Sequence, residues 1–195
     1  MNLTDMRARV RQDLQDTDAA NYRWTDAEVD GAIQRVVAEF SHYLPQEQQN
    51  ALATTSDSKD IDISTLTSRV KIFSVEFPLA KDPASFQVFQ VFLDILTMED
   101  FGDGSNARIR WGKLHVLDAA SSTIPPRHDE VIVLGATGYL AASASIGATD
   151  KTTTGGKTTV ANYLSWGQER LARYEKQLTL ISRSPRIKTS TLVFG

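Results

Sequence analysis

The stretch from Val131 to Ala142, "VIVLGATGYLAA", has the spacing that most resembles a cofactor site. Gly135, Gly138 and Ala141 follow an apolar run in a G-x-x-G-x-x-A pattern. This pattern is typical of the turn between a strand and a helix that binds the pyrophosphate of a dinucleotide. It raises the hypothesis of an oxidoreductase that binds NAD(P), which requires a strand at 131–134.

The sequence around these glycines favours a helix instead. A dinucleotide fold needs a second parallel strand and further strand–helix units, and the residues after Gly138 hold only a polar loop and a heptad pattern. Gly135, Gly138, Ala142 and Ser145 are small residues at helical spacing, which would let another backbone approach closely. We therefore expect no cofactor here, and we interpret the four residues as a packing face for another subunit.

The stretch "TTTGGKTT" at 152–159 imitates the end of a phosphate-binding loop. The required first glycine is replaced by Lys151, and no apolar strand precedes the loop. A polar loop rich in Gly and Thr is typical of a flexible linker. We predict a linker here and no nucleotide site.

The histidines offer no metal or catalytic site. His42, His115 and His128 are scattered along the chain, without partners at metal-ligand spacing. Asp129 and Glu130 follow His128, but acidic residues at the start of a helix commonly interact with the helix dipole. We therefore predict that the protein is not an enzyme and binds no metal.

The overall composition is that of a soluble globular protein of one domain. The chain has 195 residues, of which 41% are hydrophobic and 23% charged. A net charge of −3 gives no general attraction to nucleic acid or to anionic membranes, and the absence of cysteine excludes disulfides and thiolate chemistry. The N-terminus lacks the apolar core of a signal peptide, and Gly, Ser and Thr interrupt the uncharged stretch between Glu130 and Asp150. We expect a cytoplasmic product without a membrane span.

Two helices are predicted in the first fifty residues. An amphipathic pattern covers about 5–15, with Thr4 as its N-cap. Thr25 and Glu28 form a capping box that begins a second helix, and Pro45 ends it. The apolar stripe of this second helix consists of Val29, Ile33, Val36, Val37, Phe40 and Leu44.

From residue 51 to residue 117 the apolar period changes to two. Beta-branched and aromatic residues dominate these runs, and proline and glycine separate them. Consecutive strands without helices between them predict a small antiparallel sheet. The expected strands lie at 60–64, 69–77, 85–95 and 107–116.

Two more helices are predicted in the last third. The helix at 126–146 is apolar nearly all round, so we expect it to be buried either in its own bundle or against another subunit. A heptad seam then predicts a long helix through Val160, Leu164, Gly167, Leu171, Tyr174, Leu178 and Ile181.

The expected fold class is therefore α+β, mainly α. A bundle of about four helices covers 1–50 and 118–182, with an inserted β subdomain at 51–117 and an extended arm at 183–195. The arm, "RSPRIKTSTLVFG", carries a charge of +3 and no acid. Because the whole chain carries −3, the remaining residues carry −6. A basic arm with an apolar tip on an acidic body is suited to docking.

This layout resembles the head-to-tail adaptor, or connector, proteins of tailed bacteriophages. The likeness lies in "LTDMRARVRQDLQD", "NYRWTDAEVDGAIQRVVAEFS", a strand-rich insertion, "STIPPRHDEVIVLGATGYLAA", a long last helix and a C-terminal arm. It covers the whole chain in order. The patterns "RWTDAE" and "IPPRHDE" before a helix rich in Gly and Ala carry it most strongly.

The resemblance implies a structural virion protein that assembles as a ring, commonly of twelve copies, in the neck between portal and tail. It implies no enzymatic turnover, a central channel through which genomic DNA passes without sequence-specific binding, and contact with a downstream tail or stopper protein. The arm would dock onto the portal. Carried onto this sequence, the portal contacts are Arg183, Arg186, Lys188, Leu192, Val193 and Phe194. A non-viral helical interaction module is the other alternative.

Overall fold

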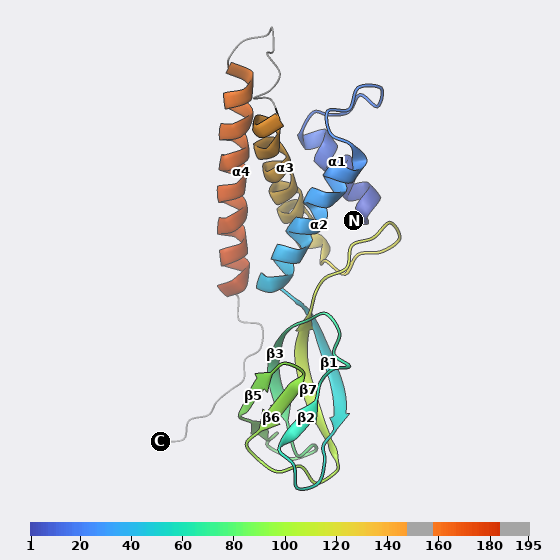
Figure 1. Cartoon of the computed structure of the whole chain (residues 1–195), viewed down its shortest axis with the longest axis vertical. Coiled ribbons are helices and arrows are strands. Elements are labelled where there is room, and N and C mark those ends of the chain that lie inside the picture. Colours follow the sequence, from blue (N-terminus) through green and yellow to red (C-terminus); the bar gives the residue numbers. More distant parts are fainter. Residues whose placement is uncertain (148–157, 184–195) are drawn as a thin grey trace. The chain divides into compact units, whose positions relative to one another are not determined.

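The computed structural model describes residues 1–147 and 158–183, and its chain forms two compact units (Figure 1). The helical unit consists of Met1–Leu44 and Val116–Gly195, and the β unit consists of Pro45–His115. Helices and antiparallel strands occur together, so the predicted α+β class is confirmed. The β unit begins at Pro45, ahead of the boundary that we expected at residue 51.

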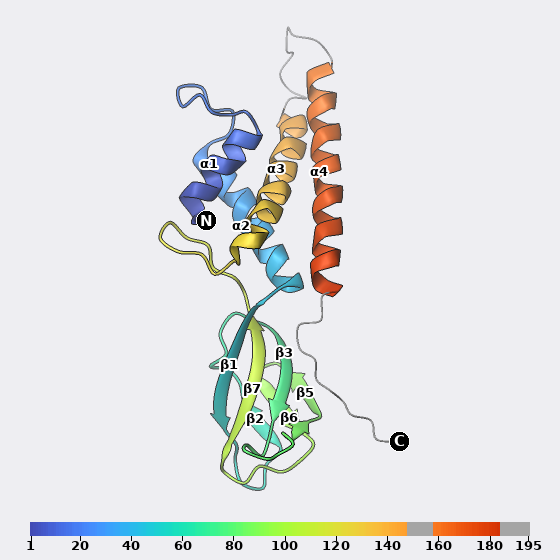
Figure 2. The same ribbon diagram turned by 180° about the vertical axis from the view of Figure 1, so that it is seen from behind.

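The helical unit consists of helices from both ends of the chain. Helices α1 (Leu3–Asp13) and α2 (Asp26–Tyr43) precede the β unit, and α3 (Asp129–Gly147) and α4 (Thr158–Arg183) follow it. Figures 1 and 2 show α3 flanked by α4 on one side and by α1 and α2 on the other. A single 3₁₀ turn, η1 (Pro126–His128), leads into α3.

Helix α1 begins earlier than the sequence predicted. Its N-cap is Asn2, not Thr4, because the Asn2 side chain accepts a hydrogen bond of 2.9 Å from the backbone N–H of Asp5. The amphipathic pattern itself is confirmed, since Met6 and Val10 are completely buried. Their side chains belong to the core that α2, α3 and α4 share.

The stripe of α2 faces this core, as predicted. Val29, Ile33, Val36, Val37 and Phe40 are all buried. Helix α2 ends at Tyr43, two residues before Pro45, with Leu44 as its C-cap. A proline cannot continue the hydrogen-bond ladder of a helix, which is consistent with an end at this point.

Helix α3 is buried on most sides by its own chain. Ile132, Val133, Ala136, Leu140 and Ala141 are all buried, and α3 contacts each of α1, α2 and α4. Of the two burial partners that we considered, the bundle of the same chain therefore accounts for the apolar character of α3. Another subunit is not required for it.

The heptad seam of α4 is confirmed from Gly167 to the end of the helix. Gly167, Tyr174 and Leu178 are buried, and Leu171 and Ile181 are half-buried. Leu164 is 37% exposed, so the seam is open at that end, and the side chain of Val160 lies outside the described residues. The seam pairs α4 chiefly with α3.

The β unit contains two antiparallel sheets, not the single sheet that we expected. The larger has the strand order β1-β7-β3-β4 and the smaller the order β2-β6-β5. Their side chains enclose a separate core that includes Ile61, Val75, Leu96 and Ile109. The strands are β1 (Gln46–Ala53), β2 (Asp60–Asp62), β3 (Arg69–Glu76), β4 (Phe86–Gln87), β5 (Phe89–Phe92), β6 (Ile95–Met98) and β7 (Asn106–Lys113).

Strand β1 was missed by the sequence interpretation, which placed residues up to 50 in the helical bundle. Its sequence, "QEQQNALA", is mostly polar, so it gives no alternating apolar pattern. The strand forms because it pairs along its whole length with β7, from Gln46 opposite Lys113 to Ala53 opposite Asn106. Asn50 also accepts a hydrogen bond of 2.8 Å from the indole of Trp111.

Candidate functional site

The glycines of the candidate nucleotide motif lie within helix α3 and not in a turn. Residues 131–134 are helical, so the strand that an NAD(P) site requires is not formed by them. A Cβ added to Gly135 would lie 2.9 Å from Cγ1 of Val36, and one added to Gly138 would lie 2.9 Å from Cγ of Leu171. The two glycines thus let α2 and α4 of the same chain approach α3.

The other two small residues of the proposed packing face are also on α3. Ala142 presents its backbone nitrogen to Gly167 of α4. Ser145 is helical, but its side chain lies outside the described residues. Close packing within the chain therefore explains Gly135, Gly138 and Ala142 without a subunit contact.

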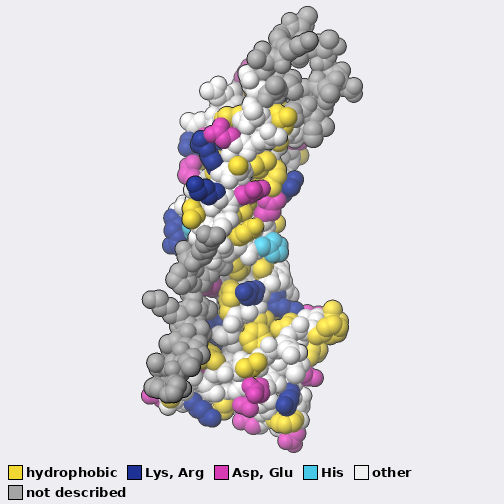
Figure 3. Space-filling view, turned by 90° about the vertical axis from the view of Figure 1, so that its left-hand side faces the viewer, with side chains coloured by type: hydrophobic (Ala, Val, Ile, Leu, Met, Phe, Trp, Pro, Cys, Tyr) yellow, Lys and Arg dark blue, Asp and Glu magenta, His cyan; other side chains and the backbone are white. Residues whose placement is uncertain are grey.

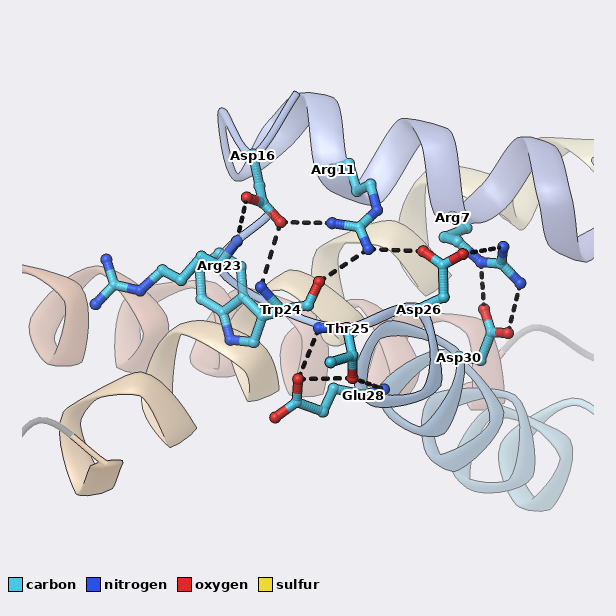
Figure 4. Close-up of polar contacts among 9 residues, drawn as sticks. All are labelled: Arg7, Arg11, Asp16, Arg23, Trp24, Thr25, Asp26, Glu28 and Asp30. Atoms are coloured by element: carbon cyan, nitrogen blue, oxygen red, sulfur yellow. Dashed lines mark hydrogen bonds and ion pairs between the residues drawn. The ribbon is translucent and has the colours of Figure 1, made fainter. Parts of the chain in front are cut away.

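The pattern "RWTDAE" forms the connection from the loop into α2 (Figure 4). Thr25 accepts from the backbone N–H of Glu28 at 3.3 Å, and the Glu28 carboxylate accepts from the backbone N–H of Thr25 at 2.7 Å. The predicted capping box is therefore confirmed. The hydrogen bond from the Thr25 backbone holds the pKa of Glu28 below its usual value.

Arg11 of α1 is the buried centre of a polar network in Figure 4. Its guanidinium pairs with Asp16 and donates to the carbonyl of Trp24 at 2.9 Å and to Asp26 at 2.7 Å. Its Cζ lies 3.6 Å from the ring centroid of Tyr22. The hydrogen bond from Arg11 lowers the pKa of Asp26. Arg11 therefore links α1 to the loop that follows it and to the first turn of α2.

Arg7 extends this network by one helical turn. It donates to both carboxylate oxygens of Asp30, at 2.7 and 2.6 Å, and to Asp26 at 2.9 Å. A bidentate pair of this kind fixes orientation as well as distance. The hydrogen bonds to Asp30 raise the pKa of Arg7 above its usual value. Arg7 and Arg11 of α1 therefore join that helix to α2 through Asp26 and Asp30.

The second pattern of the resemblance, "IPPRHDE", begins α3. The ring of His128 lies 5.4 Å from that of Phe40, and His128 Nε2 accepts from Arg127 at 3.1 Å. Asp129 is buried, and its Oδ2 pairs with the amino group of Met1 at 2.9 Å. These contacts hold His128 and Asp129 at the start of the helix, and the N-cap of η1, Pro125, has no side-chain cap.

The three histidines lie on separate elements. His42 is on α2, His115 follows β7, and His128 ends η1. Within residues 1–147 and 158–183, no group of three or more His, Asp or Glu side chains is arranged to hold a metal ion.

A polar cavity of about 320 Å³ lies in the helical unit, and the sequence did not predict it. The Tyr139 hydroxyl donates to both carboxylate oxygens of Glu39 at 2.9 Å. Burial and this carboxylate raise the pKa of Tyr139, and burial also raises that of Tyr174. Both phenols therefore stay protonated at neutral pH and act as hydrogen-bond donors. The cavity is lined by Glu39, Tyr43, Tyr139, Tyr174, Glu175, Leu178 and Thr179.

A second cavity, of about 430 Å³, lies between the end of α1 and α4. Two arginines cover its aromatic side chains, with Arg23 4.4 Å from the ring of Tyr163 and Arg170 4.7 Å from that of Trp166. Arg170 also pairs with Asp13 on the cavity wall. The charged groups beside this cavity are therefore already paired, and the pair of Asp13 with Arg170 joins α1 to α4.

The most exposed apolar side chains of the described chain lie in the β unit, where Figure 3 shows hydrophobic groups together on the surface. Phe92 is 78% exposed, Leu93 77% and Val88 70%, while Val91 and Ile95 are each 41% exposed. We call these five residues the hairpin patch, because all lie on or beside the β5–β6 hairpin. The sequence predicted a strand here but not that its apolar side chains face solvent.

The arm to which portal docking was assigned follows α4. Arg183 is the last residue of that helix, and its side chain lies outside the described residues. Arg186, Lys188, Leu192, Val193 and Phe194 also lie outside them. In the described part of the chain, no helix has the length and apolar character to cross a membrane.

Comparison with known proteins assigns no family. No family model matches the chain, and no curated protein matches it significantly. The resemblance to phage adaptors therefore rests on the motifs and on the order of elements in this chain.

Proposed function

We propose that this chain is a head-to-tail adaptor of a tailed bacteriophage. Many copies would form a ring below the portal, in the neck of the virion, and connect the capsid to the tail. The ring would act as a conduit for genomic DNA and would need no catalytic group. Twelve copies are expected from the resemblance.

The order of the elements is the single observation that carries the proposal. Two helices, α1 and α2, are followed by a separate β unit and then by α3 and α4, which complete the bundle that α1 and α2 begin. A strand-rich insertion in a helical bundle is the order that the resemblance implies for the described residues, which supports the proposal.

The two quoted patterns support the proposal through their positions. "RWTDAE" begins α2 with a capping box and ion pairs, and "IPPRHDE" begins α3. Both therefore belong to the framework of the helical unit and not to a reactive site. A framework role is what an assembly protein requires of such residues.

The proposed partners are those that the resemblance implies, and the distribution of charge is compatible with them. The basic arm, 183–195, would contact the portal through Arg186, Lys188 and its apolar tip, whereas the rest of the chain carries −6. Acidic walls would let DNA slide, because a strongly basic channel would retain it through its phosphates. A downstream tail or stopper protein would bind the other side of the ring.

Truncation tests the role of the arm. A chain that ends at Arg183 should keep its helical content and thermal transition, because the described core ends there, but should no longer sediment with the cognate portal. The matched control keeps the arm and replaces Leu180, an exposed side chain of α4, with serine. If the truncated chain still binds the portal, the arm is not the portal-binding segment. A truncated protein that keeps its oligomeric state, together with a full chain that ignores the portal, would favour the non-viral interaction module.

A further inference from the structure

The β5–β6 hairpin has a leucine where a turn residue is expected. Phe92 pairs with Ile95, so Leu93 and Asp94 form a two-residue turn. Leu93 has a φ of 52°, in the left-handed region that favours Gly, Asn or Asp, and it is 77% exposed. A leucine there costs backbone strain and gains no burial within the chain. Such a residue is explained if its side chain is buried against another molecule.

The neighbours of Leu93 extend this apolar surface along one face. Phe92 and Ile95 lie directly opposite each other across the two strands, and both are exposed. Leu96 and Met98 of β6 are buried in the core of the β unit. Because side chains alternate along a strand, Ile95 points away from that core. The hairpin therefore presents an apolar pair to solvent.

Strand β5 is also an edge strand. Within the described residues it pairs with β6 alone, and it ends the order β2-β6-β5. The outer edge of such a strand has backbone groups that can pair with another extended segment. Its exposed side chains, Val91 and Phe92, would contact that segment. An apolar, extended peptide is the ligand that such an edge fits.

The charge of the residues around the hairpin favours a peptide that is basic as well as apolar. Residues 82–107 contain five acids and no lysine or arginine, and only Asp94 of these acids is paired with Arg69, at 3.0 Å. The segment at 184–195 has the opposite character, because it carries Arg186 and Lys188 without an acid and ends in "TLVFG". The acids are Asp82, Asp94, Glu99, Asp100 and Asp103.

We propose that the hairpin patch binds residues 184–195 of a second copy of this chain. The apolar residues 192–194 would add as a short strand along β5 and cover Phe92 and Leu93. Arg186 and Lys188 would lie near the acids of 82–107. Twelve residues in fully extended form would span about 40 Å.

This inference does not rest on the proposed function. The same arm residues are assigned above to the portal, so portal and hairpin would compete for them. Without a portal, the hairpin contact would join copies of the chain to one another. The experiments below contain no portal and therefore test the hairpin contact alone.

A labelled peptide of residues 184–195 provides the first test. It is titrated into the chain that ends at Arg183, so that no internal arm competes, and binding is followed by fluorescence anisotropy. We expect saturable binding that weakens as salt is raised. A peptide with Leu192, Val193 and Phe194 replaced by serine keeps the charge and should bind at least about tenfold more weakly.

The variant Leu93→Asn separates binding from folding. Asparagine favours the left-handed backbone of this turn, so the hairpin should fold at least as well while the apolar contact is lost. We expect a loss of about tenfold in peptide affinity. Leu180→Ser, which removes an exposed leucine from α4, is the matched control and should bind as the unchanged chain does. Equal binding by both variants, or no binding of the peptide, would overturn the proposal.

Sedimentation velocity of the full chain tests whether the contact joins two copies. The full chain should associate more strongly as its concentration rises, and both Leu93→Asn and truncation after Arg183 should weaken that association. Peptide binding by a full chain that stays monomeric at all concentrations would show an arm folded back on its own chain. That result would contradict the second-copy proposal.

Discussion

Gly167 on α4 lies directly against the backbone nitrogen of Ala142 on α3, where an added Cβ would come within 2.9 Å. The same Cβ would lie 3.0 Å from the carbonyl oxygen of Gly138. Backbone atoms cannot rotate away as the end of a flexible side chain can. The contact between α3 and α4 therefore depends on the missing side chain of Gly167.

Replacement of Gly167 by alanine should destabilise the helical unit. The added methyl group must push two helices apart, so we expect the free energy of unfolding to fall by about 1 to 3 kcal/mol in urea denaturation. Gly31→Ala is the matched control, because a Cβ at Gly31 on α2 meets nothing within 4 Å. That variant should gain up to about 1 kcal/mol from helix propensity. Similar effects of the two substitutions would contradict the close contact.

The buried pair of Arg11 and Asp16 should contribute strongly to stability. Their side chains are 6% and 7% exposed, so Arg11→Met leaves a buried carboxylate without its cation. We expect a loss of about 3 kcal/mol in the free energy of unfolding, measured by chemical denaturation. Arg173→Met breaks a pair with Glu169 in which both side chains are more than half exposed, and it should cost less than about 1 kcal/mol. Equal losses would show that Arg11 is not the centre of the network.

The capping box should make stability depend on pH in the acid range. The folded-state pKa of Glu28 is lowered, so its contribution is present above its ordinary value of 4.5 and is lost as pH falls. Glu28→Gln keeps an acceptor for the Thr25 backbone but does not titrate. Its free energy of unfolding should therefore fall less than that of the unchanged chain between about pH 5 and pH 3. Parallel pH profiles for the two proteins would contradict the lowered pKa.

The Tyr139 hydroxyl should stabilise the helical unit through Glu39. Tyr139→Phe removes the hydrogen bonds of 2.9 Å and should cost about 1 kcal/mol. Because the folded-state pKa of Tyr139 is raised, its contribution is present below pH 10 and is lost as pH rises through the folded-state pKa. Tyrosinate absorbance should show one fewer late-titrating phenol in the variant. Tyr43→Phe, which changes a tyrosine of the same cavity that is 43% exposed, should change stability by no more than about 0.5 kcal/mol.

The helical part of the fold was largely predictable because its signals are local. Thr25 and Glu28 lie three residues apart, and the stripe of α2 repeats within one helix, so the sequence alone indicates both. The N-cap of α1 was placed wrongly because Asn2 and Thr4 are both good caps, and only the hydrogen bond to Asp5 distinguishes them.

The β unit was predicted less well because its strands depend on distant partners. The polar strand β1 exists through its pairing with β7, some sixty residues further along the chain. The division into two sheets likewise follows from pairings that no local pattern specifies. Alternation along "FQVF" predicted a strand, but not that β5 would be an edge with Phe92 in solvent.

The candidate sites also depend on contacts between residues that are distant in the sequence. The contact between Glu39 and Tyr139 joins residues one hundred positions apart, so no motif indicates it. The apolar surface of α3 left two burial partners open, its own bundle or another subunit, and α1, α2 and α4 of the same chain contact it. Burial of one element depends on the whole bundle and cannot be read from that element alone.

Electron microscopy of the purified chain with its cognate portal tests the central claim most directly, with the chain alone as control. The account predicts rings, seen end-on with about twelve subunits, that cap one end of the portal. A small particle of uniform size that never associates with the portal would contradict the adaptor proposal.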